Sequence, residues 1–268
     1  MLFSKGNAKF TPSVMRKWQA KQPKAAKLLQ LWPVMNDEDK QAADALAELW
    51  PVLPEQAKEK LLHSLIALLL DKAKPVQEAA ANLLLRLADE RMISPLIVAA
   101  LKDETYDITL VSKVLTGFSE KSGRILAMVY SGVNTAEKKR ILQLVGQLRP
   151  ATSTEILQFA VLEPEAELRI LAAKTSALAP PPDLLTFLAP LVQDPENSVR
   201  AAACETLGRC GGTAAVPILQ AAFNNDEAWT VKSMCASFLS KWEEQLAQQI
   251  LLDEGESHGS SLVERVSG

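Results

Sequence analysis

Histidine, cysteine and aromatic residues are scarce in this sequence. Its 268 residues include two histidines and three cysteines, and aromatic residues make up 5%. Neither His63 nor His258 is followed by glutamate, and the chain has no P-loop, GxGxxG turn or GxSxG elbow. These are side chains and motifs from which metal sites and active sites are built. We therefore expect no metal, no cofactor and no enzymatic activity.

Long hydrophobic runs are also missing. The longest, LLHSLIALLL, is about ten residues long, whereas a helix needs about 20 to cross a bilayer. The N-terminus lacks the apolar centre and small-residue cleavage site of a secretory signal. Three cysteines do not make a disulfide framework in a chain of this length. These features predict a folded cytoplasmic protein with no transmembrane segment, and 48% hydrophobic residues suffice for a large core.

Charge is spread unevenly, although the net charge is only -3. Residues 1–27 contain seven bases and no acid, so the remainder of the chain carries about -10. Residues 253–268, rich in glycine, serine and charge, are predicted to form a flexible acidic tail. The bases of the N-terminal arm are candidate contacts for nucleic acid phosphates, an anionic membrane or an acidic protein; the arm could equally be a plain soluble terminus. They are Lys5, Lys9, Arg16, Lys17, Lys21, Lys24 and Lys27.

A repeat of 31 or 32 residues fills most of the chain. Three copies have an acid, an aliphatic residue five positions later and then a base. Earlier copies, at Asp71/Val76 and Asp103/Ile108, keep the first two residues and lose the base. The complete copies are Glu163/Leu168/Arg169, Asp194/Val199/Arg200 and Asp226/Val231/Lys232.

Within each copy, apolar and small residues follow the period of a helix. The spacing from each aliphatic residue predicts a continuous stripe along three helical turns. Another apolar helical segment precedes it, and Pro, Gly, Asn and Asp fill the gaps. No segment alternates with period two, so a sheet is not expected. In one copy the predicted stripe contains Val199, Ala202, Ala203, Thr206, Leu207 and Cys210.

The segment DPENSVRAAACETLGRCGGTAAVPILQAAF resembles a HEAT repeat, in the short bacterial form also seen in phycobilisome lyase-type proteins. The resemblance covers roughly residues 60–245. It weakens where Ser176 takes the position of Leu207, and near Ile141, where the acid is missing. It implies an all-α fold, a right-handed α-solenoid of stacked helical hairpins with a HEAT/armadillo-like superhelix. In similar solenoids the second helix of each pair lines the inner face.

We expect the solenoid to occupy residues 28–252, with regular repeats at 71–252. Residues 28–70 have a repetition of their own, because LWPVMNDEDKQAADAL and LWPVLPEQAKEKLLHSL start 18 residues apart. Trp32 and Trp50 each precede a proline, which disfavours a helical conformation at that residue. They are predicted to end helices in degenerate capping hairpins, with a cofactor-binding aromatic pair as the alternative.

The cysteines are interpreted as structural. Cys204 and Cys210 are six residues apart on one predicted helix, so they point to different sides and cannot share a metal ion. Cys210 and Cys235 occupy positions of the stripe and are predicted to be core residues. Cys204 lies off the stripe and is predicted to be the exposed thiol.

The repeated acid and base are interpreted as a device that fastens the turn between two helices. The carboxylate can accept hydrogen bonds from free backbone N–H groups at a helix start. The base would bind it within its own repeat or a neighbouring one. The alternative is that Arg169, Arg200 and Lys232 form a basic ladder that faces an acidic partner.

Repeat architecture without a catalytic constellation predicts a protein–protein interaction module or assembly scaffold that uses its concave face. The first alternative is a bilin lyase or chaperone-like subunit acting on a tetrapyrrole-carrying protein, and it depends on the resemblance alone. The second is a binder of nucleic acid or a membrane surface through the arm, since the acidic body disfavours nucleic acid. HEAT-repeat metal hydroxylases carry His–Glu pairs that this chain lacks. Candidate contacts beside the stripe are Lys174, Glu205, Arg209 and Ser233.

Overall fold

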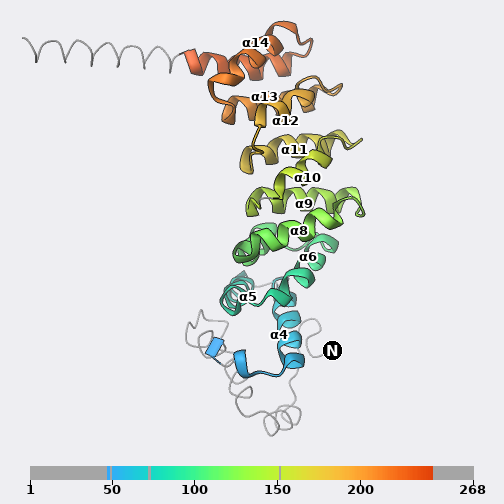
Figure 1. The fold of residues 1–268 in the computed structure, drawn as a ribbon, viewed down its shortest axis with the longest axis vertical. Helices are drawn as coiled ribbons and strands as arrows, with labels where there is room; N and C mark the ends of the chain where they lie inside the picture. The colour runs from blue at the N-terminus through green and yellow to red at the C-terminus, as the bar shows by residue number, and fades with distance from the viewer. Residues whose placement is uncertain (1–46, 49, 72–73, 151, 244–268) are drawn as a thin grey trace, which may run out of the picture. The chain divides into compact units, whose positions relative to one another are not determined.

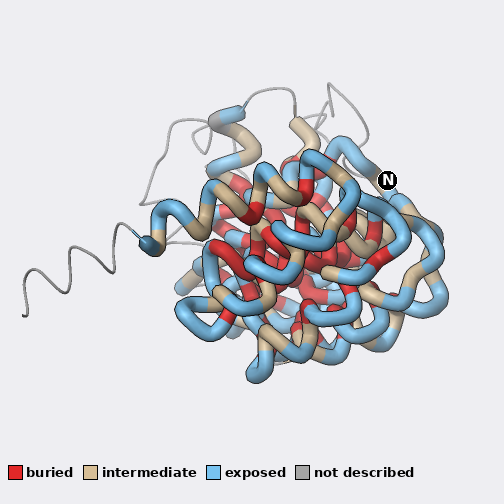
Figure 2. The backbone as a smooth tube through the Cα atoms, turned by 90° about the horizontal axis from the view of Figure 1, so that it is seen from above, coloured by how far each residue is buried: buried red, intermediate tan, exposed pale blue. Residues whose placement is uncertain are grey.

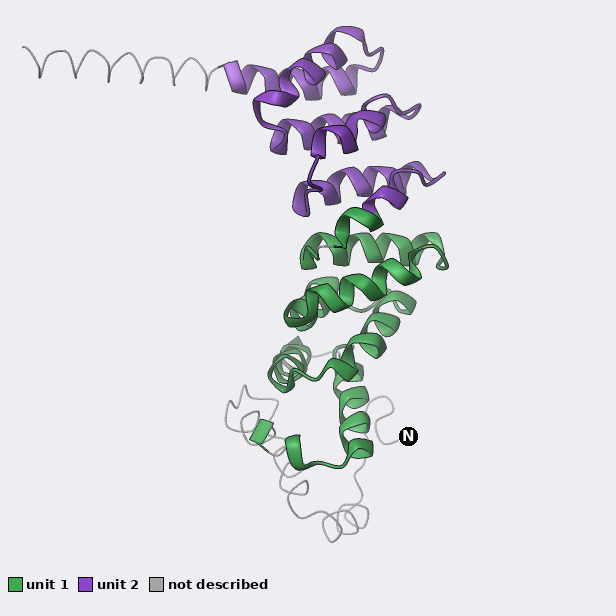
Figure 3. Ribbon diagram, viewed as in Figure 1, with its two compact units in different colours: residues 1–156 green, residues 157–268 purple. Residues whose placement is uncertain are grey.

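The structure is a computed structural model, and its described part contains helices and no strand. None of the helices described is both long and apolar enough to span a bilayer. The chain divides into two compact units, residues 1–156 and 157–268, and we treat each by itself (Figure 3). The predicted arm and tail lie outside the described residues. Those residues are 47–48, 50–71, 74–150 and 152–243.

Unit 1 consists of consecutive helix pairs (Figure 1). Each first helix packs against the second helix of its own pair, and α5, α7 and α9 pack against one another in that order. Helix α6 contacts both α4 and α8, so the first helices form the other layer. The first helices are α4 (Glu55–Leu68), α6 (Ile93–Lys102) and α8 (Ser119–Tyr130); the second helices are α5 (Lys74–Leu87), α7 (Ile108–Leu115) and α9 (Thr135–Leu148).

Unit 2 repeats this arrangement around α13. Helix α13 packs against α11, α12 and α14, and its core also includes residues of a helix at 229–243. Helix α10 (Ser153–Ala160) begins before the boundary between the units and ends after it. The other helices are α11 (Ala166–Leu178), α12 (Leu184–Val192), α13 (Asn197–Cys210) and α14 (Val216–Asn225).

The helix pairs follow the predicted repeat. Each second helix includes the aliphatic residue that anchors its copy. Asn134 and Glu137 form a reciprocal capping box at the start of α9, with both hydrogen bonds 3.0 Å long. Asp107 accepts a 2.7 Å hydrogen bond from the Thr109 N–H at the start of α7. The all-α class and the stacked hairpins are therefore confirmed within each unit.

Two local features differ from or refine the expectation. The predicted three-turn helix from Ile108 ends at Leu115 and continues as a 3-10 turn, Thr116–Phe118. Gly117 lies in that turn, and glycine is a poor helix former. We expected capping repeats to end at residue 70 and regular repeats to begin at residue 71. These two residues lie between α4 and α5, which pack against each other.

The burial of α13 is broader than its predicted stripe. Five of the six stripe residues are buried, but Cys210 is exposed and Cys204 is fully buried, so the predictions for these two cysteines are wrong, whereas Cys235 is buried as predicted. Cys210 is the last residue of the helix, beyond the packed part. Cys204 is buried because α13 has neighbours on several sides. Figure 2 shows buried positions recurring along the helices in this way.

Gly208 allows a close approach between α13 and the helix at 229–243. A Cβ atom on Gly208 would lie 2.2 Å from Cγ of Phe238. We expect Gly208→Ala to lower the free energy of unfolding by about 1–2 kcal/mol, because overpacking outweighs alanine's higher helix propensity. Urea titration followed by circular dichroism measures this. The matched control is Gly117→Ala, where a Cβ meets nothing within 4 Å; equal stability losses in the two variants would contradict the close-packing explanation.

Candidate functional site

A shallow groove of about 370 Å³ crosses three successive second helices of unit 2. Helix α13 supplies its floor, while α11 and the helix at 229–243 supply its two walls. Because the repeat places equivalent positions on the same side of each helix, the groove lies on one continuous face. Its lining residues are Ile170, Lys174, Asn197, Ser198, Ala201, Ala202, Glu205, Thr230 and Met234.

The groove combines an apolar centre with polar margins. Ala201 and Ala202 keep the floor low, and Ile170 and Met234 flank it from the neighbouring helices. Lys174 is the base in the lining, and it is exposed. Small residues on the central helix and longer ones on both sides make a depression that an apolar side chain of another molecule can enter.

Two of the four predicted contact residues, Lys174 and Glu205, line this groove. Arg209 lies one turn beyond Glu205 and forms a 2.8 Å ion pair with it. Ser233 is exposed on the last described helix, next to Met234 but outside the lining. Their role in binding stays a prediction, as does that of the seven arm bases, which lie outside the described residues.

Trp229 was not predicted from the sequence as a surface residue. Its side chain is 79% exposed, and it directly precedes Thr230 in the groove lining. Counted from the aliphatic anchor of its copy, it takes the position that Asn197 has in α13. Comparison of the copies by register, rather than by stripe, would have shown a tryptophan where its neighbours have Asn and Ala.

The repeated base binds the next repeat's acid. Arg169 donates to both carboxylate oxygens of Asp194, at 2.7 and 2.9 Å, and also to the backbone oxygens of Glu163 and Pro164. Burial alone would raise the pKa of Asp194, but hydrogen bonds from Arg169 and from the Glu196 N–H hold that pKa below its usual range. One guanidinium thus ties its own turn to the following one.

The next copy repeats this geometry. Arg200 donates to Asp226 at 2.7 and 3.0 Å and to the backbone oxygen of Asp194 at 2.8 Å. In an earlier copy Gln77 replaces the base and still donates to the Asp71 backbone oxygen at 2.7 Å. The side chains of Arg169 and Arg200 are only 11% and 18% exposed. The geometry therefore supports a structural role for these arginines and contradicts a ladder that presents them to a partner.

The Cys204 thiol of unit 2 has no sign of activation, whereas the hydrogen bond with Cys204 lowers the pKa of the Cys235 thiol. Cys204 and Cys235 are both fully buried, in the same core cluster. The hydrogen bond between their side chains, together with burial, raises the pKa of the Cys204 thiol. A thiol held protonated is a poor nucleophile and a poor metal ligand. Within the described residues, no group of His, Cys, Asp or Glu side chains is arranged to hold a metal ion.

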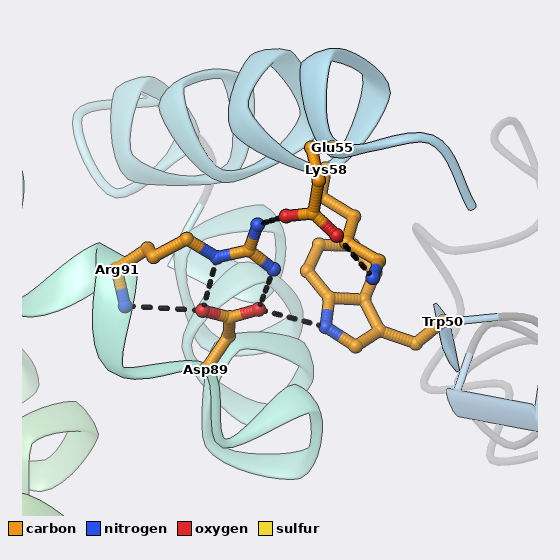
Figure 4. A network of polar contacts seen from close by, with 5 residues as sticks. All are labelled: Trp50, Glu55, Lys58, Asp89 and Arg91. Carbon is orange, nitrogen blue, oxygen red and sulfur yellow. Dashed lines mark hydrogen bonds and ion pairs between the residues drawn. The ribbon is translucent and has the colours of Figure 1, made fainter. Parts of the chain in front are cut away.

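Trp50 belongs to a polar network at the start of the described helices (Figure 4). Its ring N–H donates to Asp89 at 3.0 Å, and Arg91 binds both Asp89 and Glu55. Lys58 pairs with Glu55 at 2.9 Å. The indole is buried, and the network joins the Trp50–Val52 turn to α4 and to the turn before α6. The capping interpretation of Trp50 stays a prediction, and Trp32 lies outside the described residues.

Stacked helix pairs with a repeat of 31 or 32 residues make the described residues an all-α helical-repeat structure. Comparison with known families gives the particular repeat: residues 153–240 match the family model of HEAT repeats. The matched segment covers the groove and both arginine–aspartate links. No curated protein matches the chain.

Proposed function

We propose that this chain is a non-catalytic scaffold that binds a protein partner across the groove of unit 2. The observation that carries the proposal is the groove itself, an apolar depression built from three successive repeats. An apolar centre within a polar margin is the usual composition of a protein interface. Stacked repeats also present extended surfaces that suit a segment of another protein.

Individual side chains add to this argument. Trp229 is a large exposed aromatic residue beside the groove, and tryptophan is enriched among residues that dominate binding energy. Lys174 on one wall and Glu205 on the floor would contact polar groups of the partner. Arg209 and Ser233 would contact it at the margin.

The alternatives from the sequence have less support. A bilin lyase or chaperone-like role depends on the resemblance to phycobilisome lyase-type repeats, whereas the matching family model is that of HEAT repeats in general. Binding of nucleic acid or a membrane surface would involve residues 1–27. Cytoplasmic localisation also stays a prediction.

The groove can be tested by filling it. Ala201 is half-buried at the centre of the floor, where an arginine would occupy the space of an incoming side chain. We expect Ala201→Arg to reduce partner recovery about tenfold or more, the effect of losing one strong contact. Affinity capture from a lysate with quantitative mass spectrometry measures recovery.

The matched control is Met128→Arg on α8, at a position 82% exposed in unit 1. Proteins captured by the unaltered chain and by this control, but lost from Ala201→Arg, bind through the groove. Equal recovery by all three chains, or turnover by the purified chain with no protein captured, would refute the proposal.

A further inference from the structure

The groove of unit 2 changes in chemistry along its length. Because each repeat has the same order of elements, its three second helices run in the same direction, and the lining can be followed from their starts toward their ends. The lining is polar and uncharged at the helix starts, apolar in the middle and charged toward the helix ends. In that order the residues are Asn197, Ser198 and Thr230, then Ile170, Ala201, Ala202 and Met234, then Lys174 and Glu205.

The charged end of the groove has one cation that folding does not use. Glu205 is bound to Arg209 by an ion pair of 2.8 Å, so these two charges match each other. Lys174 is exposed, and it makes no hydrogen bond or ion pair with any of the described residues. The unmatched charge of the lining is therefore positive. Its complement in a partner is a carboxylate, which pairs with an ammonium group through a charge-assisted hydrogen bond.

The apolar floor lies one helical turn from this cation. Ile170 precedes Lys174 by four residues on α11, and Ala201 takes the position of Ile170 in the next repeat. Four residues of a helix rise about 6 Å. Two side chains of a partner that are about 6 Å apart, four residues on a helix or two in an extended segment, therefore reach the floor and the ammonium group together.

The acidic composition of unit 2 does not oppose a carboxylate at this end. Residues 157–243 contain ten acids and six bases, but the acids nearest the lining are engaged. Glu205 is paired with Arg209, and Glu196 interacts with Arg169. Glu227 precedes the helix at 229–243, so it lies at the opposite end of the groove from Lys174. A negative end and a positive end also favour one direction of an incoming segment over the other.

We propose that the partner of the groove is a protein segment in which an aliphatic side chain is followed or preceded at this spacing by an acidic one. The aliphatic side chain occupies the floor at Ala201, between Ile170 and Met234, and the carboxylate binds the ammonium group of Lys174. The inference rests on the proposed function, because it gives the chemistry of the partner which that function requires.

A library of random peptides displayed on phage, selected against the full chain, tests this chemistry. We expect the enriched peptides to share Leu, Ile or Met with Asp or Glu two or four residues away. One such peptide is then synthesised with a fluorescent label, together with a copy in which lysine replaces the acid. The acidic peptide should bind the full chain about tenfold more tightly than the lysine peptide, as measured by fluorescence polarisation.

Charge reversal at Lys174 makes the result specific to that residue. In Lys174→Glu the order of the two peptides should reverse, because the new carboxylate repels the acidic peptide and attracts the lysine peptide. The matched control is Lys241→Glu, at an exposed position of the last described helix and outside the lining, which should leave the order unchanged. Enriched peptides without an acid, or a preference for the acidic peptide that survives Lys174→Glu, would overturn the inference.

The inference and the proposed function fail in different ways. If Ala201→Arg abolishes peptide binding while Lys174→Glu keeps the preference for acid, the groove binds protein segments and only the stated chemistry of the partner is wrong. If partner recovery from a lysate is the same with and without Ala201→Arg, the proposed function itself fails. Self-association of the full chain that Ala201→Arg abolishes, with no peptide enriched, would identify a second copy as the occupant and overturn the inference.

Discussion

Replacing Arg140 with methionine is expected to lower the free energy of unfolding by about 3–4 kcal/mol. Arg140 is 9% exposed, and its guanidinium donates to three backbone oxygens, one at the end of α6 and two between α6 and α7. Those acceptors are Ala100, Glu104 at 3.3 Å and Tyr106 at 2.7 Å. Methionine fills a similar volume but leaves the acceptors without these donors. Urea denaturation followed by circular dichroism measures the change.

The control for Arg140 is Arg124→Met on α8. Arg124 is exposed, so its replacement should change stability by less than about 0.5 kcal/mol. Similar losses in the two variants would show that loss of positive charge, rather than loss of the buried hydrogen bonds, destabilises the protein.

The second large effect is expected for Arg200→Ala. This change removes two hydrogen bonds to Asp226 and those to the backbone oxygens of Asp194 and Pro195. We expect the free energy of unfolding to fall by about 2–3 kcal/mol. This is less than the cost of breaking a deeply buried pair, because Arg200 keeps some contact with water. Chemical denaturation of the full chain measures it, and Arg200→Lys should recover only part of the loss because lysine cannot bind in the same two-pronged way.

The loss of stability caused by Arg200→Ala should also depend on pH. The hydrogen bond from Arg200 is the main cause of the lowered pKa of Asp226 in the folded chain. Because the pKa of Asp226 is lower in the folded chain than in the unfolded chain, the Arg200–Asp226 pair contributes its full stabilisation above the unfolded pKa of about 3.9. This stabilisation decreases as the pH falls below that value. The stability difference between the two chains should therefore shrink below about pH 4.

Arg209→Ala provides the matched control on the same helix. Its pair with Glu205 is largely exposed on the arginine side, and removal should cost less than about 0.5 kcal/mol. A constant difference between Arg200→Ala and the unaltered chain over pH 2–7 would contradict the assigned role of Asp226.

The repeat made the helices predictable, because an offset of 31 or 32 residues with helical spacing leaves few other folds. The turn carboxylates were predictable for the same reason: Asp194 and Asp226 accept from backbone N–H groups two residues later. The sequence left open whether each base binds its own repeat or a neighbour. In the structure each arginine does both. It binds backbone carbonyl oxygens of its own turn and the aspartate carboxylate of the next turn.

Solvent exposure was harder to predict than helix position. A stripe describes one face of a helix, but α13 is packed on several sides, so Cys204 is buried although it lies off the stripe. The buried contacts of Arg140 could not be predicted from the sequence. Its copy lacks the usual acid, and its acceptors are backbone oxygens, which belong to no particular residue type.

The groove was predictable only in part. Lys174 and Glu205 were chosen because charged residues beside a stripe suggest an accessible surface. The floor is made of Ala201 and Ala202, whose small size matters only once the neighbouring helices are in place. Trp229 was missed because it precedes the stripe, and the stripe does not predict which face of the helix such a residue occupies.

The shared arginine–aspartate contacts have a consequence for how unit 2 comes apart. Asp194 accepts from Arg169 through its carboxylate and from Arg200 through its backbone oxygen, so it belongs to two successive links at once. In a linear array of repeats, a residue shared by two links strengthens the interface between neighbouring repeats relative to the stability of each repeat alone. Fraying from either end is then expected to carry a large interfacial penalty, and we expect these repeats to melt together as one cooperative block.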